Sequence, residues 1–444
     1  MSHYLVVGLG KTGHSIARYL QRHHLDFSVF DTREQTEAVA PFHLEFPDID
    51  LYLGEFPEEK LAQISEIIVS PGVPLETPCL VAAKALGLPI YGDIECLARN
   101  LDARVIAITG TNGKSTVTTL VGLMAHTFGL KTAVAGNIGM PVLDLLADDI
   151  DYDLWVLELS SFQLDLIESL QPIAATMLNI TPDHLDRHHT LEAYIAAKQR
   201  VYHQAQCMVY NREDAVTQPW DPAKAKSISS FGLNEAIEGQ WGLILDQEET
   251  FLAYGKTKLL SVDELRIQGR HNWANALAAC AVAHAAGISF AAMQDVLKTF
   301  AGLPHRTQWV RTFNDVNWIN DSKGTNIGAT QSAIAGIGGA ISGKIVLIAG
   351  GQGKGADFRE LRAVVSTHVR ILIVLGEDAP KLEAALLDLV EVKRVVTLED
   401  AVDEAYHAAR AGDVVLLSPA CASLDMFRDF NHRGEMFADL VGAL

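Results

Sequence analysis

The sequence predicts an α/β protein of three domains, each built on a mainly parallel sheet with flanking helices. Short β-branched runs alternate with helical patterns through most of the chain, as expected for parallel sheets covered by helices. This alternation starts anew at three places along the chain. A length of 444 residues, at about 150 residues per domain, agrees with three domains.

The three starts are strand-like runs: YLVVG at residues 4–8, RVIAITG at 104–110 and VNWIND at 316–321. After the first run, a helical pattern over 11–23 leads to the strand-like FSVFD at 27–31. Stretches near residues 97 and 303 separate the starts, so we expect domains over 1–97, 98–303 and 304–444.

The last domain continues with strand-like runs separated by helical patterns, which predicts a doubly wound sheet, and we expect VNWIND to be its first strand. Residues 226–267 break the rhythm of the central domain, because they contain short strand-like pieces and turn residues without a helix. We expect small antiparallel hairpins there. The runs of the last domain lie at 344–351, 370–376, 393–398 and 413–419.

Composition and charge exclude several classes of protein. The 35 basic and 55 acidic residues give a net charge of −20, which disfavours nucleic-acid partners and anionic membrane surfaces. Five scattered cysteines without a CxxC pair predict neither a disulfide framework nor a zinc site. The longest apolar run, residues 276–283, is too short to span a membrane, and no secretory signal is evident. We expect a cytoplasmic protein without membrane insertion.

The first motif is GLGKTG at residues 8–13, which follows a strand and opens a helix, with Asp31 ending the next strand. This arrangement fits the dinucleotide fingerprint, in which a diphosphate sits at the helix N-terminus, and predicts a Rossmann-like first domain. Glycine turns also occur only to pack a strand on a helix. The fingerprint does not distinguish a nicotinamide cofactor from a nucleotide-linked substrate.

The second motif, TGTNGKST at residues 109–116, lies between an apolar strand and a helix and predicts a phosphate loop. The usual spacing would place glycine at Ile108, but the G-K-S end is kept. Lys114 can contact the β and γ phosphates and Ser115 can ligate Mg²⁺. An opposite-charge contact of this kind contributes on the order of 4 kcal/mol at ~4 Å and a dielectric of ~20. The predicted ATP contacts are Gly110, Thr111, Asn112, Gly113, Lys114, Ser115 and Thr116.

Several further motifs occur in order along the chain. They are ELSSFQL (158–164), LNITPDHLD (178–186), GRHNWANALAA (269–279), LPHR (303–306) and NDSKGTN (320–326). Together with TGTNGKST they resemble the Mur ligase family of peptidoglycan synthesis, over all three expected domains. Within it, VFDTR (29–33), GGQGKGADF (350–358) and SPACASLDMF (418–427) are similar to the member that adds D-glutamate to UDP-N-acetylmuramoyl-L-alanine. One position differs from the motif of that member: residue 324 is a glycine, Gly324, where the resemblance leads us to expect alanine.

The resemblance implies ATP and two Mg²⁺ ions as cofactors. Ser115, Glu158, His184 and Lys198 would be metal ligands, with Lys198 first converted by CO₂ to a carbamate, and Lys114, His184 and Lys198 would be catalytic. Without the resemblance, Glu158 would be a solvated strand end, His184 a surface residue and Lys198 a solvated cation.

The resemblance also places Asn272 beside the adenine, and Arg306 and Asp321 near ATP. From the residues alone, Asn272 is better explained as a helix N-cap. Arg306 could simply pair with an acid.

The two substrates would be UDP-N-acetylmuramoyl-L-alanine and D-glutamate. The resemblance places Asp31, Thr32 and Arg33 near the uracil, and Ser70, Gly72 and Asn137 near the diphosphate and sugar. The D-glutamate site would be formed by Lys323, Thr325, Lys354, Ser423 and Phe430.

The implied reaction is ATP-dependent amide formation through an acyl phosphate, in a monomer that closes its domains around the substrates. Three alternatives stay open at this point. They are another amide ligase of this family, including one acting on folate; an NAD-dependent oxidoreductase; and a non-catalytic nucleotide switch.

Overall fold

The computed structural model describes residues 2–148, 150–267, 269–339 and 341–444. It separates into two compact units. One comprises Met1–Asn179, Ile195–Leu260 and Ala276–Val296; the other comprises Ile180–Tyr194, Ser261–Asn275 and Leu297–Leu444.

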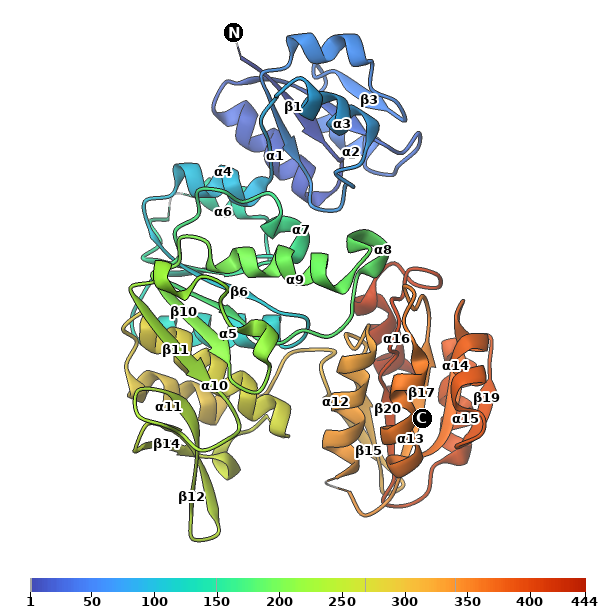
Figure 1. The fold of residues 1–444 in the computed structure, drawn as a ribbon. Helices are drawn as coiled ribbons and strands as arrows, with labels where there is room; N and C mark the ends of the chain where they lie inside the picture. The colour runs from blue at the N-terminus through green and yellow to red at the C-terminus, as the bar shows by residue number, and fades with distance from the viewer. Residues whose placement is uncertain (1, 149, 268, 340) are drawn as a thin grey trace. The chain divides into compact units, whose positions relative to one another are not determined.

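The first sheet, in the blue N-terminal part of the chain in Figure 1, has five parallel strands in the order β3-β2-β1-β4-β5, the order of a Rossmann-like half. Apolar residues that alternate along β1 and β4, such as Leu5 and Ile67, are buried beneath the helices. The strands are β1 (His3–Val7), β2 (Asp26–Asp31), β3 (Leu51–Leu53), β4 (Glu66–Val69) and β5 (Ile90–Tyr91). The helices are α1 (Lys11–Arg22), α2 (Val39–Glu45), α3 (Pro78–Ala85) and α4 (Asp93–Asn100).

The second sheet has six parallel strands in the order β11-β10-β9-β6-β8-β7. Its central strand β6 leads into the phosphate-loop motif, so the motif lies at the carboxyl edge of the sheet. The strands are β6 (Arg104–Thr109), β7 (Thr132–Gly136), β8 (Leu154–Glu158), β9 (Ala174–Met177), β10 (Cys207–Asn211) and β11 (Ser227–Phe231). The helices between residues 114 and 299 are α5 (Lys114–Thr127), α6 (Val142–Leu146), α7 (Ser161–Leu164), α8 (Leu185–His188), α9 (Leu191–Gln199), α10 (Arg270–Ala285) and α11 (Phe290–Thr299).

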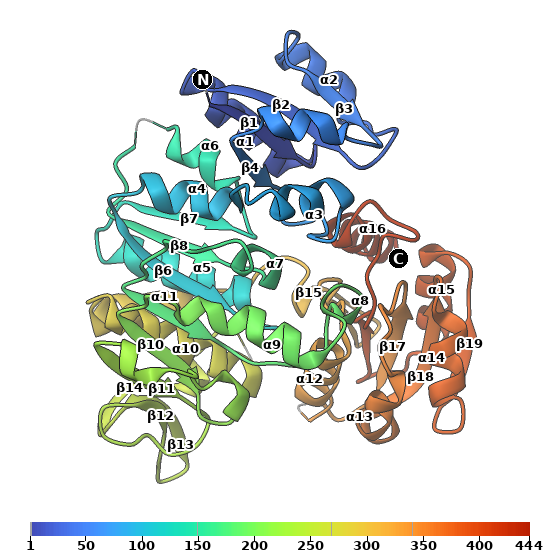
Figure 2. The same ribbon diagram turned by 45° about the horizontal axis from the view of Figure 1, so that its top comes forward.

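A three-stranded sheet of β12 (Trp241–Asp246), β13 (Glu249–Tyr254) and β14 (Thr257–Ser261) follows. The antiparallel hairpin β12–β13 extends away from the second sheet in both views (Figure 2). The expected hairpins within 226–267 are thus confirmed in part. The expectation is wrong for β11, which pairs in parallel with β10 because its residues 227–231 complete the edge of the second sheet.

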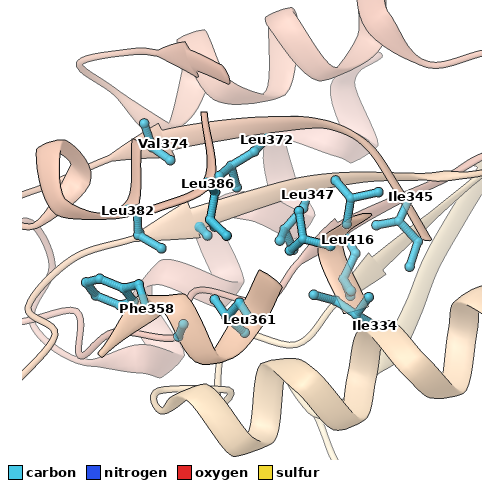
Figure 3. Close-up of a cluster of buried hydrophobic side chains, with 14 of the residues drawn as sticks. Ile334, Ile345, Leu347, Phe358, Leu361, Leu372, Val374, Leu382, Leu386 and Leu416 are labelled. Atoms are coloured by element: carbon cyan, nitrogen blue, oxygen red, sulfur yellow. The ribbon is translucent and has the colours of Figure 1, made fainter. Parts of the chain in front are cut away.

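The third sheet has the order β15-β16-β20-β17-β18-β19, and β15 is antiparallel to β16. Two helix layers cover it. Residues of α12, α13 and α14 bury one face with Leu347 and Leu372 (Figure 3), and α15 and α16 bury the other with Trp318 and Phe437. The strands are β15 (Gln308–Phe313), β16 (Val316–Asn320), β17 (Ile345–Gly350), β18 (Val369–Leu375), β19 (Glu391–Arg394) and β20 (Val414–Leu417). The helices are α12 (Ile327–Gly338), α13 (Arg362–His368), α14 (Ala379–Leu386), α15 (Leu398–Ala408) and α16 (Phe430–Ala443).

Two details of the last domain correct the sequence-based expectations. VNWIND is the second strand of this sheet, because the polar stretch β15 pairs with it as an antiparallel edge. The strand expected at 393–398 lies at Glu391–Arg394, since Thr397 already caps α15.

The α/β class and the mainly parallel sheets are confirmed. The domain boundaries stay predictions, and the one expected at 97/98 falls within α4.

Candidate active site

The phosphate-loop motif forms the turn between β6 and α5. Residues 110–113 follow the strand, and Lys114, Ser115 and Thr116 begin the helix. The Nζ of Lys114 donates to the carbonyl oxygens of Gly110 at 2.9 Å and Thr111 at 2.8 Å, so the ammonium group lies over its own loop. A helix N-terminus beside a lysine provides the positive potential that binds a polyphosphate.

Asn179, which follows β9, holds this loop in shape. Its carbonyl oxygen accepts from the N–H of Thr111, and its side chain exchanges two hydrogen bonds with the backbone of Asn112, at 2.8 and 3.0 Å. Sequence reasoning assigned no role to Asn179. The sequence feature that could have indicated such a role is its position in the motif LNITPDHLD, just after the strand that pairs with β6.

Glu158 ends β8, opposite Ile108 of β6, and only 2% of its surface is exposed. One carboxylate oxygen, Oε1, accepts from Nδ2 of Asn137 at 2.9 Å. The other, Oε2, is buried without a hydrogen-bond partner. A buried carboxylate oxygen without a donor is costly unless a cation or another donor completes it. Glu158 therefore fits the expected Mg²⁺ ligand.

The second oxygen ligand predicted for this Mg²⁺ ion comes from Ser115. Ser115, with a buried hydroxyl at the first turn of α5, adds a second hard oxygen of the kind Mg²⁺ prefers. In the parts of the chain that the structure describes, no three His, Cys, Asp or Glu side chains gather as a metal site.

Lys198 lies on α9 and is buried, with 2% of its surface exposed. Its Nζ donates to the carbonyl oxygen of Gly110 at 2.8 Å and approaches Oγ1 of Thr109 at 3.4 Å. The alternative of a solvated cation is wrong, because the helix turns this side chain toward the phosphate loop. Burying an ammonium group is expensive unless hydrogen bonds compensate for the lost water, and the carbonyl oxygen of Gly110 provides one such bond.

The TPDH loop and the glycine-rich loop after β17 meet within the second unit. Lys354 Nζ lies 3.6 Å from Oδ1 of Asp183, and Asn326 donates to Oδ2 of Asp183 at 3.3 Å. His184 follows with a left-handed backbone, and its N–H donates to Asp183. Lys354 thus lies beside a carboxylate of its own chain, and its pairing with a carboxylate of the substrate stays a prediction. Asp183 was quoted only within a motif, and sequence reasoning gave it no role.

Asp321 follows β16 and is buried. Its carboxylate accepts from Oγ of Ser418 at 2.7 Å and from the N–H of Thr307 at 3.0 Å. Desolvation raises the pKa of Asp321 to about 6, although Ser418, Thr307 and the charge of Arg306 act to lower it. The charge of Arg306 thus acts on the carboxylate of Asp321. The contact of the two residues with ATP stays a prediction.

Gly324 has a packing role in this chain. A Cβ atom there would lie 2.5 Å from Oδ2 of Asp321 and 2.8 Å from Oγ of Ser418. An alanine at this position would require the hydrogen-bonded pair of Asp321 and Ser418 to move. The glycine therefore leaves room for Asp321 to be buried where it is.

The other residues predicted for D-glutamate lie in the segment after β16, in the loop after β20 and at the start of α16. Lys323 lies over the ring of Phe430, with Nζ 3.7 Å from the ring centre. Thr325 is half-buried, and Ser423 is buried in the loop after β20. This arrangement offers cations, hydroxyls and an aromatic wall within one unit.

The first sheet and its loops contain most of the residues predicted for the UDP-linked substrate, whereas Asn137 follows β7 of the second sheet. Asp31 is buried and accepts from the N–H of Leu9 at 2.7 Å and from the guanidinium of Arg33. Although burial opposes it, these donors keep the pKa of Asp31 below its usual value. Ser70 donates to the carbonyl oxygen of Gly8, so its hydroxyl stabilises the glycine turn. Thr32 and Gly72 are exposed.

Asn272 is the third residue of α10, and its N–H donates to the carbonyl oxygen of Gly269. The N-cap explanation is therefore wrong, because the helix begins two residues earlier. Contact with adenine stays a prediction.

The parallel sheet, the phosphate loop and the buried strand-end carboxylate together define a P-loop nucleotide-binding enzyme. Three family models cover most of the chain: the Mur ligase MurD-like N-terminal domain at residues 2–92, the Mur ligase middle domain at 108–283 and the Mur ligase glutamate ligase domain at 305–421.

A UDP-N-acetylmuramoylalanine--D-glutamate ligase of Legionella pneumophila is 61% identical over 442 residues, 99% of each chain. Its counterpart in Pseudomonas aeruginosa is 50% identical and covers 99% of this chain and 98% of its own. The crystal structure of UDP-N-acetylmuramate-alanine ligase from Thermotoga maritima has the same fold, with a TM-score of 0.62 at 18% identity, over 100% of this chain and 99% of that one. The chain belongs to the Mur ligase family.

Among the described residues, no helix has the length and apolar character needed to cross a membrane.

Proposed function

We propose that the protein joins D-glutamate to UDP-N-acetylmuramoyl-L-alanine at the expense of ATP, in the synthesis of the peptidoglycan precursor. The observation that carries this function is the 61% identity, over nearly the whole of both chains, to a ligase of that name. The phosphate loop and the buried Glu158 supply the chemistry that such a ligase needs.

In the first step, the terminal carboxylate of the UDP-linked substrate attacks the γ phosphate of ATP, and ADP leaves. Lys114 and the N-terminus of α5 stabilise the charge that develops on the phosphoryl oxygens. Ser115 and Glu158 would hold Mg²⁺, which when bound neutralises phosphate charge. The product of this step is an acyl phosphate.

In the second step, the amine of D-glutamate attacks the activated carbonyl, and phosphate leaves as the amide forms. Lys354 and Lys323 would pair with the two carboxylates of D-glutamate, while Thr325 and Ser423 donate hydrogen bonds and Phe430 forms a wall. The loops of the first sheet, with Asp31, Thr32, Arg33, Ser70 and Gly72, would hold the UDP group. Asn272, Arg306 and Asp321 would complete the ATP contacts.

Lys198 would act as a carbamate, together with His184, at a second Mg²⁺ ion. Its burial against Gly110 supports this proposal, because both Lys114 and Lys198 donate to the same carbonyl oxygen. Two ammonium groups so close together repel each other, and carbamate formation would remove one of the charges. Native mass spectrometry of active enzyme should show an added CO₂ that Lys198→Ala lacks. An unmodified mass at full activity would contradict the carbamate.

Phosphate release tests the proposed activity. With MgATP and the UDP-linked substrate, release should depend on D-glutamate and stay at background with L-glutamate or L-alanine. Equal turnover with another amino acid would favour a different ligase of the family. ATP turnover without amide would indicate a nucleotide switch. Quenching of NADH fluorescence on binding would favour an oxidoreductase, whereas we expect only ATP to bind. We further propose that the enzyme is cytoplasmic and monomeric.

A further inference from the structure

Glu158 is held by the neighbouring strand β7 at two points. In the parallel register, Gly136 lies opposite Glu158, and the next residue, Asn137, donates its backbone N–H to the carbonyl oxygen of Glu158 at 2.8 Å. The side chain of Asn137 then donates from Nδ2 to Oε1 of the same glutamate at 2.9 Å. One residue thus contacts both the backbone and the carboxylate of Glu158.

Gly136 makes this double contact possible. Its backbone has φ +101°, and a Cβ atom there would lie 2.2 Å from the carbonyl oxygen of Glu158. Any larger residue would push the two strands apart at this point. The glycine therefore brings the peptide of Asn137 directly against Glu158.

The chemistry of the pair sets the orientation of the amide group. A carboxylate only accepts hydrogen bonds, so the amide must present its NH₂ group to Glu158. With Oε1 occupied in this way, Oε2 is the carboxylate oxygen left buried and without a partner. The contact therefore selects which oxygen of Glu158 is available to a cation.

We propose that Asn137 is a positioning residue that orients the Glu158 carboxylate toward the Mg²⁺ ion of bound MgATP. The proposal rests on the function proposed above, and it adds a role to the sequence-based expectation that Asn137 contacts the diphosphate and sugar of the substrate. The NH₂ group of Asn137 has two N–H bonds, and Oε1 of Glu158 accepts one of them, so the contact with Glu158 leaves the expected contact with the substrate possible.

The test measures metal binding without chemistry. Binding of Mn²⁺ in the presence of a non-hydrolysable ATP analogue is followed by electron paramagnetic resonance for the wild type, Asn137→Ala, Glu158→Gln and the double variant. Loss of a partner that orients a metal ligand weakens metal affinity by about 10-fold or more, and we expect this for Asn137→Ala. In the Glu158→Gln background, Asn137→Ala should cause no additional loss, because the residue it orients is already changed.

Two controls make the outcome decisive. Thr132→Ala removes a hydrogen bond at the far end of β7 and serves as the matched control, with unchanged Mn²⁺ affinity. Thermal unfolding checks that the variants fold, so that a change in Mn²⁺ affinity reflects the site. Normal Mn²⁺ affinity in Asn137→Ala or an additive loss in the double variant would overturn the proposal. Absence of D-glutamate-dependent turnover in the wild type would instead overturn the proposed function.

Discussion

At the residue scale, two positively charged ammonium groups meet at one carbonyl oxygen, although the net charge of the chain is −20. Lys114, from the start of α5, and Lys198, from α9, both donate to Gly110. Residues 84 positions apart in the sequence thus converge on the phosphate loop. This convergence is unfavourable in isolation and becomes favourable when an anion or a charge-changing modification is present.

Lys114→Ala should lower kcat/KM by about 100-fold to 1,000-fold, the range typical for loss of one group that stabilises transition-state charge. The measurement is ADP release with both substrates and MgATP. Lys114→Arg keeps the charge and tests whether its placement matters. Near-normal acyl-phosphate formation in Lys114→Ala would show that the loop lysine does not act on the phosphoryl group.

Asp321 should make stability depend on pH. Its pKa of about 6 in the folded protein exceeds the ordinary value of 3.8, so the folded state keeps a proton that the unfolded chain releases. The free energy of unfolding therefore decreases as the pH rises from about 4 to about 6. Asp321→Asn lacks this loss, and its stability relative to the wild type should increase by about 3 kcal/mol across that window.

Urea unfolding of the wild type and Asp321→Asn at pH 4 and pH 7 measures this difference. Asp93 is also buried with a raised pKa, but it is present in both proteins and its effect cancels. Exposed Asp403→Asn is the control for a simple change of charge. An equal difference at both pH values would show that Asp321 is not destabilised by burial.

At the element scale, the short helix α7 explains part of the ELSSFQL motif. Ser160 accepts from the N–H of Gln163 at 3.2 Å, and the side chain of Gln163 accepts from the N–H of Ser160 at 3.0 Å. This capping box begins two residues after Glu158. It stabilises the turn that follows Glu158, the predicted metal ligand.

Ser160→Ala should lower the free energy of unfolding by about 1 kcal/mol, because the N–H of Gln163 loses its acceptor. Chemical denaturation measures the change. Ser160→Thr keeps a hydroxyl acceptor and should recover most of the loss. If Ser160→Thr were as unstable as Ser160→Ala, crowding at this position rather than the cap would determine stability.

At the scale of the whole molecule, the residues predicted for the reaction are divided between the two compact units. The phosphate loop, Glu158 and Lys198 belong to one, and Asp183, His184 and the residues predicted for D-glutamate belong to the other. A reaction between ATP and the two substrates requires these groups to act together, which is the reason for the expected domain closure.

Small-angle X-ray scattering should therefore show a smaller radius of gyration with a non-hydrolysable ATP analogue, Mg²⁺ and the UDP-linked substrate than without ligands. The nucleotide alone is the control for partial closure. Identical scattering curves with and without the ligands would contradict a large closure.

Much of this architecture was predictable because its signals are local. The alternation of strands and helices, the phosphate-loop spacing and the position of Glu158 at a strand end follow from short stretches of sequence. The edge strand β15 and the parallel pairing of β11 were not predictable in this way. Their partners are chosen by sheet edges that form from distant parts of the chain.

The amino-acid sequence by itself determined the fold class, the phosphate loop and the resemblance to one ligase family, since these depend on residue types and spacing along the chain. Only the tertiary structure decided that Lys198 is buried against Gly110 and that Asn137 holds one oxygen of Glu158 while the other lacks a donor. The physical reason is that burial and hydrogen-bond partnership arise between strands and helices that are neighbours in space, and side-chain spacing in the sequence does not encode them directly.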